Sequence, residues 1–121
     1  MPKFSKLSLE RLATCHLDLQ RVAKAAIKRT DFTVSCGHRG EQEQNEAFAR
    51  GFSKLKFPNS KHNKTPSLAM DLVPYPVDWE DVKRFDELAV IVKEEAIKLG
   101  VSLTWGGNWP KFKDRPHYEL P

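Results

Sequence analysis

The spacing of apolar residues predicts a helical N-terminal region followed by a strand. Between residues 8 and 28, leucine, valine, alanine and isoleucine recur near helical spacing, which predicts one long amphipathic helix or two short ones packed on a core. Residues 31–36 alternate instead, with Phe32, Val34 and Cys36 on one face, as expected for a half-buried strand.

The middle of the chain predicts a short helix, a long loop and a buried strand. Residues 41–50 have helical propensity and are followed by Gly51, a typical helix stop. Residues 51–67 show no period and read as a loop. Residues 68–73 form a short apolar run, which predicts a buried strand, and Asp71 places a carboxylate inside it.

The C-terminal third predicts one long helix and two strands. Asp78 is a good N-cap for a helix over residues 79–99, and Gly100 fits the position after its end. Three segments complete the pattern: a strand over 101–105, a tight loop over 106–110 and a last strand over 117–120. We therefore expect an α+β fold, a small antiparallel β-sheet with helices packed on one face.

Size and composition indicate one domain, residues 1–121, with an ordinary globular core. The chain is 40% hydrophobic and 30% charged, which excludes a disordered chain. No apolar run reaches the about 18 residues that a membrane span needs. The N-terminus lacks the apolar centre of a signal peptide, so we expect synthesis in the cytoplasm without Sec export.

Charge and cysteine content narrow the function classes further. The net charge of +4 would help the protein approach an anionic polymer, although a solvated basic surface is the simpler interpretation. A nucleic-acid binder is disfavoured because no recognised motif or basic cluster is present. Cys15 and Cys36 lack metal-site spacing, so we interpret them as buried free thiols; a disulfide or a reactive nucleophile stays open.

Three separated residues form a candidate metal site. His62, Asp71 and His117 offer two imidazoles and one carboxylate, and three protein ligands with one open position are typical of catalytic zinc. Each residue alone has a plainer interpretation: a solvent-exposed loop histidine, a buried salt bridge or N-cap, and a core histidine. A carboxylate inside an apolar strand is costly unless it is paired or binds a metal, which favours the joint interpretation.

Two further residues could supply chemistry to such a site. Asp114 lies three positions before His117, and Pro116 stiffens the turn between them. A carboxylate held there could act as general acid and base, although a turn-forming aspartate is the alternative. Arg39 follows the predicted strand and could anchor a carboxylate or an oxyanion, with a surface ion pair as the alternative.

Taken in order, the motifs resemble a known family. They are Gly37-His38-Arg39 with Gln44, Ser60-Lys61-His62, Ser67-Leu68-Ala69-Met70-Asp71, and Asp114-Arg115-Pro116-His117. The loop Trp105-Gly106-Gly107-Asn108-Trp109 also looks like that family's Trp/Gly loop. Over residues 9–120 the chain resembles the zinc D-Ala-D-Ala carboxypeptidase and L-alanyl-D-glutamate peptidase family, in particular its phage endolysin branch, and this implies a hedgehog/DD-peptidase-like fold.

The resemblance implies a role for each matched residue: zinc ligands His62, Asp71 and His117, general acid/base Asp114, catalytic and substrate-binding Arg39, and substrate-binding Ser60 and Gln44. Two departures from the family pattern stand out. His62 and Asp71 are nine positions apart, two more than usual, and Ser67 replaces a usual glycine. Because a loop can absorb residues 63–66, we expect the ligands still to converge, with a reshaped pocket rim.

The resemblance implies a Zn2+-dependent endopeptidase that cleaves the L-Ala–D-Glu bond of the peptidoglycan stem peptide. The implied protein is a monomeric phage-type endolysin without a separate cell-wall-binding domain, stable membrane association or nucleic-acid partner. It would be made in the host cytoplasm and reach periplasmic peptidoglycan through a holin. A D-Ala-D-Ala carboxypeptidase is the alternative activity, and a catalytically silent zinc- or wall-binding module is the alternative class.

Overall fold

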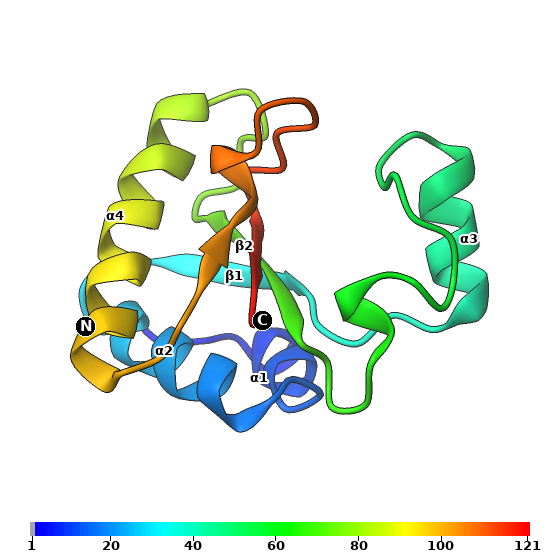
Figure 1. The fold of residues 1–121 in the computed structure, drawn as a ribbon. Coiled ribbons are helices and arrows are strands. Elements are labelled where there is room, and N and C mark those ends of the chain that lie inside the picture. Colours follow the sequence, from blue (N-terminus) through cyan, green and yellow to red (C-terminus); the bar gives the residue numbers. More distant parts are fainter. Residues whose placement is uncertain (1) are drawn as a thin grey trace.

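The computed structural model describes residues 2–121, which form four α-helices, two short 3-10 helices and one four-stranded antiparallel sheet (Figure 1). In chain order the elements are α1 (Lys6–Leu12), α2 (Leu17–Ile27), β1 (Phe32–Cys36), α3 (Glu41–Ala49), η1 (Lys61–Asn63), β2 (Ala69–Pro74), α4 (Val82–Leu99), β3 (Thr104–Trp105), η2 (Gly106–Asn108) and β4 (His117–Glu119). The strand order is β1-β2-β4-β3. The predicted α+β class with a small antiparallel sheet is confirmed.

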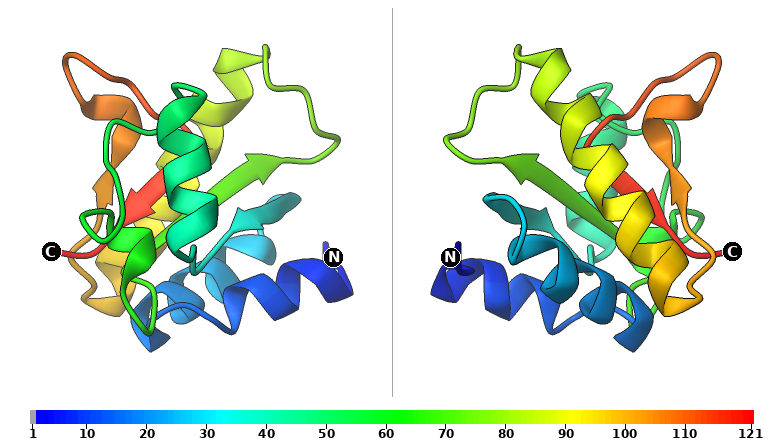
Figure 2. Two further views of the ribbon diagram at one scale, coloured as in Figure 1. Left: turned by 90° about the vertical axis from the view of Figure 1, so that its right-hand side faces the viewer. Right: turned by 90° about the vertical axis from the view of Figure 1, so that its left-hand side faces the viewer.

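The sheet has one face on the core and the other toward a separate segment. Helices α2 and α4 pack against each other and cover the core face, while α1 lies along β1 (Figures 1 and 2). Residues 41–60, which we call the arm, comprise α3 and the loop after it, and they stand apart on the opposite side of the sheet from α4 (Figure 1). The core contains apolar residues of α2, α4 and all four strands.

The helix boundaries follow local capping, and one prediction about them is wrong. The N-terminal region forms two helices, the second of the two alternatives. Helix α4 begins at Val82 with Asp81 as its N-cap, and Asp78 instead accepts a hydrogen bond from the Glu80 amide at 3.0 Å. Gly100 follows the end of α4 with a left-handed backbone, at φ of 71°, as predicted for a glycine at this position.

The strands are shorter and less regular than the sequence pattern predicts. The expected strand over 101–105 pairs only at Thr104–Trp105, because the Val101 amide bonds to the Ala96 carbonyl and belongs to the end of α4. In β1 the register shifts between Val34 and Cys36, which is a β-bulge. None of the helices within residues 2–121 has both the length and the apolar character needed to cross a bilayer.

Candidate metal centre

Two residues of the predicted triad come from neighbouring strands. In the β2–β4 pairing Asp71 lies opposite His117, and Met70 lies opposite Tyr118. Successive side chains of a strand point to opposite faces of the sheet. Met70 and Tyr118 are fully buried in the core, so Asp71 and His117 both project from the other face, toward the arm.

The third residue, His62, comes from the short helix η1 beside the strands. The Ser60 hydroxyl caps η1 by accepting the His62 amide at 3.2 Å, and the His62 carbonyl accepts the Arg39 amide at 2.8 Å. The Leu68 amide donates to the Lys61 carbonyl at 3.1 Å, which closes the intervening loop. The longer spacing from His62 to Asp71 is therefore accommodated outside the site, as expected.

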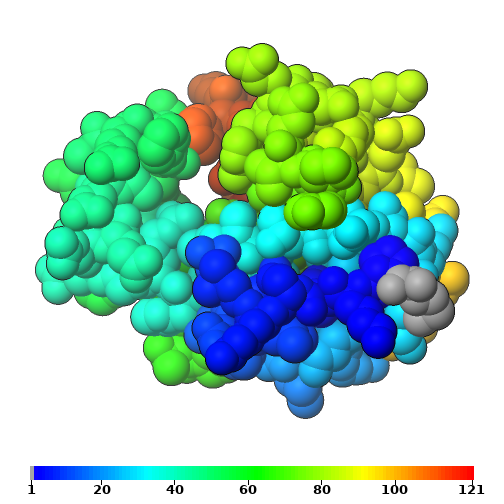
Figure 3. All heavy atoms as spheres, turned by 180° about the vertical axis from the view of Figure 1, so that it is seen from behind, coloured from blue at the N-terminus to red at the C-terminus, as the bar shows by residue number. Residues whose placement is uncertain are grey.

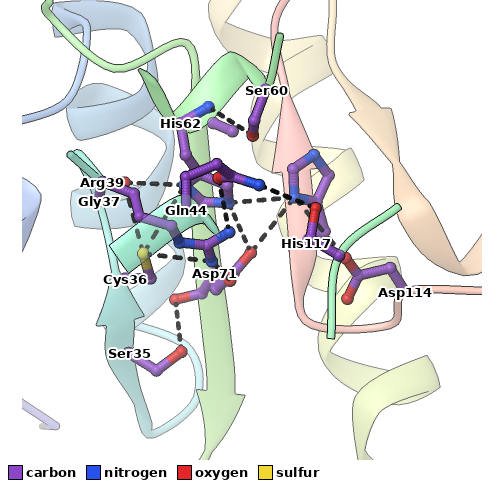
Figure 4. Close-up of polar contacts among 12 residues, drawn as sticks. Ser35, Cys36, Gly37, Arg39, Gln44, Ser60, His62, Asp71, Asp114 and His117 are labelled. Carbon is purple, nitrogen blue, oxygen red and sulfur yellow. Dashed lines mark hydrogen bonds and ion pairs between the residues drawn. The ribbon is translucent and has the colours of Figure 1, made fainter. Parts of the chain in front are cut away.

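Three side-chain atoms of this triad form a nearly equilateral triangle (Figure 4). His62 Nε2 lies 3.2 Å from Asp71 Oδ1 and 3.2 Å from His117 Nδ1, and the last two atoms are 3.3 Å apart. A tetrahedral zinc ion with ligands at about 2.0–2.1 Å separates its ligand atoms by about 3.3 Å. The donor types and their spacing both fit a catalytic zinc site with an open fourth position.

The outer nitrogen of each imidazole has a partner that fixes the ring. His62 Nδ1 lies 2.7 Å from the Gly37 carbonyl oxygen, and His117 Nε2 lies 2.7 Å from Glu119 Oε1. Both oxygens only accept, so these ring nitrogens donate, and the nitrogens that face the triangle are left unprotonated in the neutral ring. Such partners are typical of metal-ligating histidines.

A second group of ligand atoms involves Cys36. Atoms of Cys36, His62 and Asp71 lie within 4.8 Å of one another. The sulfur approaches His62 on its Nδ1 side, at 3.8 Å, where that nitrogen already contacts Gly37. The triangle with His117 is tighter, and its two nitrogens do not contact a backbone carbonyl, so we favour it as the metal site.

The β-bulge explains why Cys36 lies here. The interrupted alternation places Cys36 beside Asp71, on the site face, and its side chain is only partly buried. The expectation of a buried thiol on the same face as Phe32 and Val34 is therefore wrong for Cys36. Cys15 is a buried free thiol as expected, and burial raises its pKa to about 12.

Charges within the triangle are strongly coupled. Burial lowers the pKa of His62, but the Asp71 carboxylate more than offsets this and the net pKa is about 10. Burial also disfavours the Asp71 anion, yet His62 and His117 hold the Asp71 pKa well below its usual range. Asp71 is thus an ionised carboxylate between two imidazoles, an environment that a divalent cation would also satisfy.

Asp114 is placed beside the triangle by the turn before β4. Its Oδ2 lies 3.9 Å from His117 Nδ1, and its backbone amide donates to the Gly106 carbonyl at 3.0 Å. Burial, followed by the negative charge of Asp71, raises the pKa of Asp114 to about 6. A carboxyl group in this range can both accept and donate a proton near neutral pH.

Arg39 and Gln44 connect the arm to the triangle. Arg39 Nη2 lies 3.5 Å from Asp71 Oδ2, and Arg39 Nη1 donates to Gln44 Oε1 at 3.1 Å. Gln44 is fully buried, and its amide nitrogen donates to Ser53 Oγ at 3.0 Å and to the Leu55 carbonyl at 2.6 Å. Gln44 thus holds Arg39 and the arm loop rather than lining the pocket.

The triangle lies in a pocket of about 850 Å³ between the arm and the strands. Seen from behind, an opening separates the arm from the body, and the orange-red C-terminal segment is visible beside it (Figure 3). Arg39, Ser60 and Asp114 line this pocket together with the three triangle residues. Apolar side chains such as Phe52 and Trp79 are exposed at its walls.

Sequence reasoning missed two contributors to this site. Glu119 shares a strand face with His117 at a spacing of two, a signal that a period-two search around the candidate ligand could have found. The Gly37 carbonyl carries no side-chain signal. Gly37 is itself required for close packing, because an added Cβ would lie 2.3 Å from the Arg11 carbonyl oxygen.

The sequence of this chain is similar to those of known proteins. The sequence profile of the phage L-alanyl-D-glutamate peptidase family matches residues 1–120. The chain is 33% identical over 112 residues to the L-alanyl-D-glutamate peptidase of Escherichia phage T5, covering 88% of this chain and 81% of that protein. It is 32% identical over 115 residues to the peptidoglycan L-alanyl-D-glutamate endopeptidase CwlK of Bacillus subtilis, covering 81% of this chain and 65% of CwlK.

A solved structure extends the similarity to the fold. The crystal structure of the L-Ala D-Glu endopeptidase ChiX of Serratia marcescens superposes with a TM-score of 0.84 and 33% sequence identity. The match covers 98% of this chain and 90% of ChiX.

Proposed function

The chain belongs to the phage L-alanyl-D-glutamate peptidase family, and we propose that it is a zinc-dependent peptidoglycan endopeptidase that cleaves the L-Ala–D-Glu bond of the stem peptide. The observation that carries the zinc assignment is the triangle of His62 Nε2, Asp71 Oδ1 and His117 Nδ1, with sides of 3.2–3.3 Å. Asp114, 3.9 Å from one corner, supports hydrolysis over a purely structural metal.

Zinc bound by His62, Asp71 and His117 would polarise the scissile carbonyl and lower the pKa of a coordinated water molecule. Asp114 accepts the proton that the attacking water loses and passes it to the leaving nitrogen of the D-glutamyl residue. In the metal-free fold, burial and the negative charge of Asp71 raise its pKa to about 6. The Asp114 amide donates to the Gly106 carbonyl, which holds the backbone of this residue beside the triangle.

Arg39 supplies positive charge on the arm side of the pocket. Its guanidinium group contacts Asp71 and Gln44 and lines the same pocket as Asp114. A fork of donors in this position can bind a substrate oxygen that gains negative charge during hydrolysis. Ser60 contributes indirectly, because its hydroxyl caps the turn that carries His62.

The biological setting that fits this activity is host-cell lysis at the end of phage infection. In this setting the protein is made in the host cytoplasm, reaches the periplasmic peptidoglycan after release through a holin, and acts as a monomer through residues 1–121 as one catalytic domain. The similarity to the phage T5 peptidase supports the phage setting of this proposal.

The decisive experiment is digestion of purified peptidoglycan sacculi with zinc-loaded protein, followed by identification of the new termini. New C-terminal L-alanine together with new N-terminal D-glutamate is the expected result. Release of free D-alanine alone would overturn the endopeptidase assignment in favour of a D-Ala-D-Ala carboxypeptidase. Sacculi that bind the protein without any new terminus would indicate a wall-binding module.

A further inference from the structure

Two lysines of the pocket have no anionic partner among residues 2–121, and one of them already donates to a backbone carbonyl. Besides the two histidines of the triangle, the pocket is lined by one arginine and two lysines, Arg39, Lys54 and Lys61. Arg39 contacts Asp71 at 3.5 Å, and Lys61 Nζ donates to the Leu120 carbonyl at 2.9 Å. Among residues 2–121, no carboxylate forms an ion pair with Lys54. Lys54 is therefore the pocket cation that remains available to an anionic ligand.

The position of Lys54 is fixed more firmly than that of an ordinary surface lysine. It stands between Ser53 and Leu55, the two residues that the buried Gln44 amide holds through hydrogen bonds. Its Nζ lies 5.1 Å from the centroid of the Phe112 ring, which belongs to the opposite wall of the pocket. Attraction between an ammonium group and an aromatic face directs the charge across the pocket from the arm.

We propose that Lys54 binds the free carboxylate of the D-glutamyl residue on the leaving side of the scissile bond. This inference rests on the proposed function. A D-glutamyl residue has two carboxyl groups, and a peptide that continues through one of them leaves the other ionised. The same residue supplies the leaving nitrogen, which Asp114 protonates.

The chain places Lys54 on the correct side for this contact. Lys54 lies against Phe112, and Phe112 is two residues before Asp114 in the same segment. A substrate carboxylate close to the Asp114 carboxylate is disfavoured by like-charge repulsion. The Lys54 ammonium offsets this repulsion and binds the glutamyl carboxylate by a charge-assisted hydrogen bond.

The test uses two peptides that are identical except at this group. Both contain the L-Ala–D-Glu bond, and the free glutamyl carboxylate of the first is a carboxamide in the second. The zinc-loaded protein should cleave the carboxylate peptide with a kcat/KM about tenfold higher, mainly through KM. Lys54→Met should abolish this preference by lowering kcat/KM for the carboxylate peptide to about that for the carboxamide peptide, whereas Lys54→Arg should keep the preference.

Lys56→Met is the matched control. Lys56 lies two positions along the same exposed loop, and its Nζ is 5.0 Å from the centroid of the Phe48 ring, but it does not line the pocket. Its replacement should leave the tenfold preference intact.

Three results would overturn the inference. They are a Lys54→Met variant that retains the preference, a wild-type protein that has none, and an equal loss on both peptides after Lys54→Met. Each leaves the proposed function standing, because both peptides are still cleaved at the same bond by the wild-type protein. If the wild-type protein cleaves neither peptide, the proposed function itself is overturned and the subsite with it.

Discussion

Each imidazole of the triad has one nitrogen facing the proposed metal position and the other in contact with an orienting partner, and the two partners differ in kind. His62 donates to a backbone carbonyl, at Gly37, which no side-chain substitution removes. His117 donates to the Glu119 carboxylate. The Glu119 carboxylate also makes the His117 ring more basic. A substitution at Glu119 can therefore change how strongly His117 would bind the metal.

Replacement of Glu119 should therefore weaken the metal site without destroying it. Loss of an outer partner of a metal-bound histidine typically costs about 10–100-fold in metal affinity. Glu119→Ala should lower the zinc affinity by this factor in a competition titration with a chelator. Glu119→Gln, which keeps an oxygen acceptor, should lose less. An unchanged affinity in Glu119→Ala would show that the 2.7 Å contact does not orient His117.

Asp114 should matter for catalysis alone. Asp114→Asn keeps the shape of the side chain and removes its ability to exchange a proton, so peptide cleavage should fall by about 10²–10⁴-fold while zinc content and Tm stay close to wild type. The matched control is Asp86→Asn, because Asp86 pairs with Arg115 on the surface. An Asp114→Asn variant with more than about a tenth of wild-type activity would remove Asp114 from the mechanism.

Residue types explain which parts of the site could be predicted. His62, Asp71, His117 and Asp114 have side chains whose chemistry is visible in sequence, and their motifs give their order. The Gly37 carbonyl could not be predicted, because every residue has a carbonyl and only the fold selects one. Gln44 was predicted as a substrate-binding residue, but its burial and its contacts with Arg39 are properties of the folded arm.

At the scale of elements, the predictions succeeded where periodicity is strong and missed where a local contact competes with it. Strand β2 and most of α4 follow their apolar patterns. The start of α4 does not, because Asp78 forms a local turn and Trp79 stacks on Phe85, with ring centroids 5.9 Å apart. The β-bulge at Ser35 has no signature in the alternation itself, although bulges are common beside functional sites.

The short helix η2 positions Asp114 and His117 through close backbone packing. A Cβ on Gly106 would lie 2.4 Å from the Asp114 carbonyl oxygen and 3.1 Å from the His117 Cβ. Gly106→Ala should therefore displace the segment that carries both residues, destabilise the protein by about 1–3 kcal/mol and reduce activity more than it reduces the folded fraction. Denaturant unfolding and peptide cleavage measure the two effects.

Gly40→Ala serves as the control for this substitution, because the nearest atom to its added Cβ is 3.9 Å away. Equal effects of Gly106→Ala and Gly40→Ala would show that the close approach at Gly106 does not hold the site in place.

At the scale of the whole molecule, we expect metal binding and folding to be linked through the buried imidazoles. The His62 pKa rises from 6.5 to about 10 in the metal-free fold, so the contact with Asp71 contributes stability that is complete below pH 6.5 and is lost as pH rises toward 10. Zinc requires the same nitrogen unprotonated, so its binding releases protons and its affinity increases with pH. As pH rises from 6.5 toward 10, the metal-free fold therefore loses stability while the affinity for zinc increases.

We expect the Tm of chelator-treated protein to fall between pH 6 and 8, while the increase in Tm caused by zinc at a fixed free concentration grows. Zinc at a hundred times its Kd stabilises the fold by about 2.7 kcal/mol, and each proton displaced changes the binding free energy by about 1.4 kcal/mol per pH unit. His38→Gln, which removes an exposed histidine outside the triangle, should behave as wild type. A zinc-induced Tm increase that is equal at pH 6 and pH 8 would contradict binding through His62 and His117, because no proton would then compete with the metal for these nitrogens.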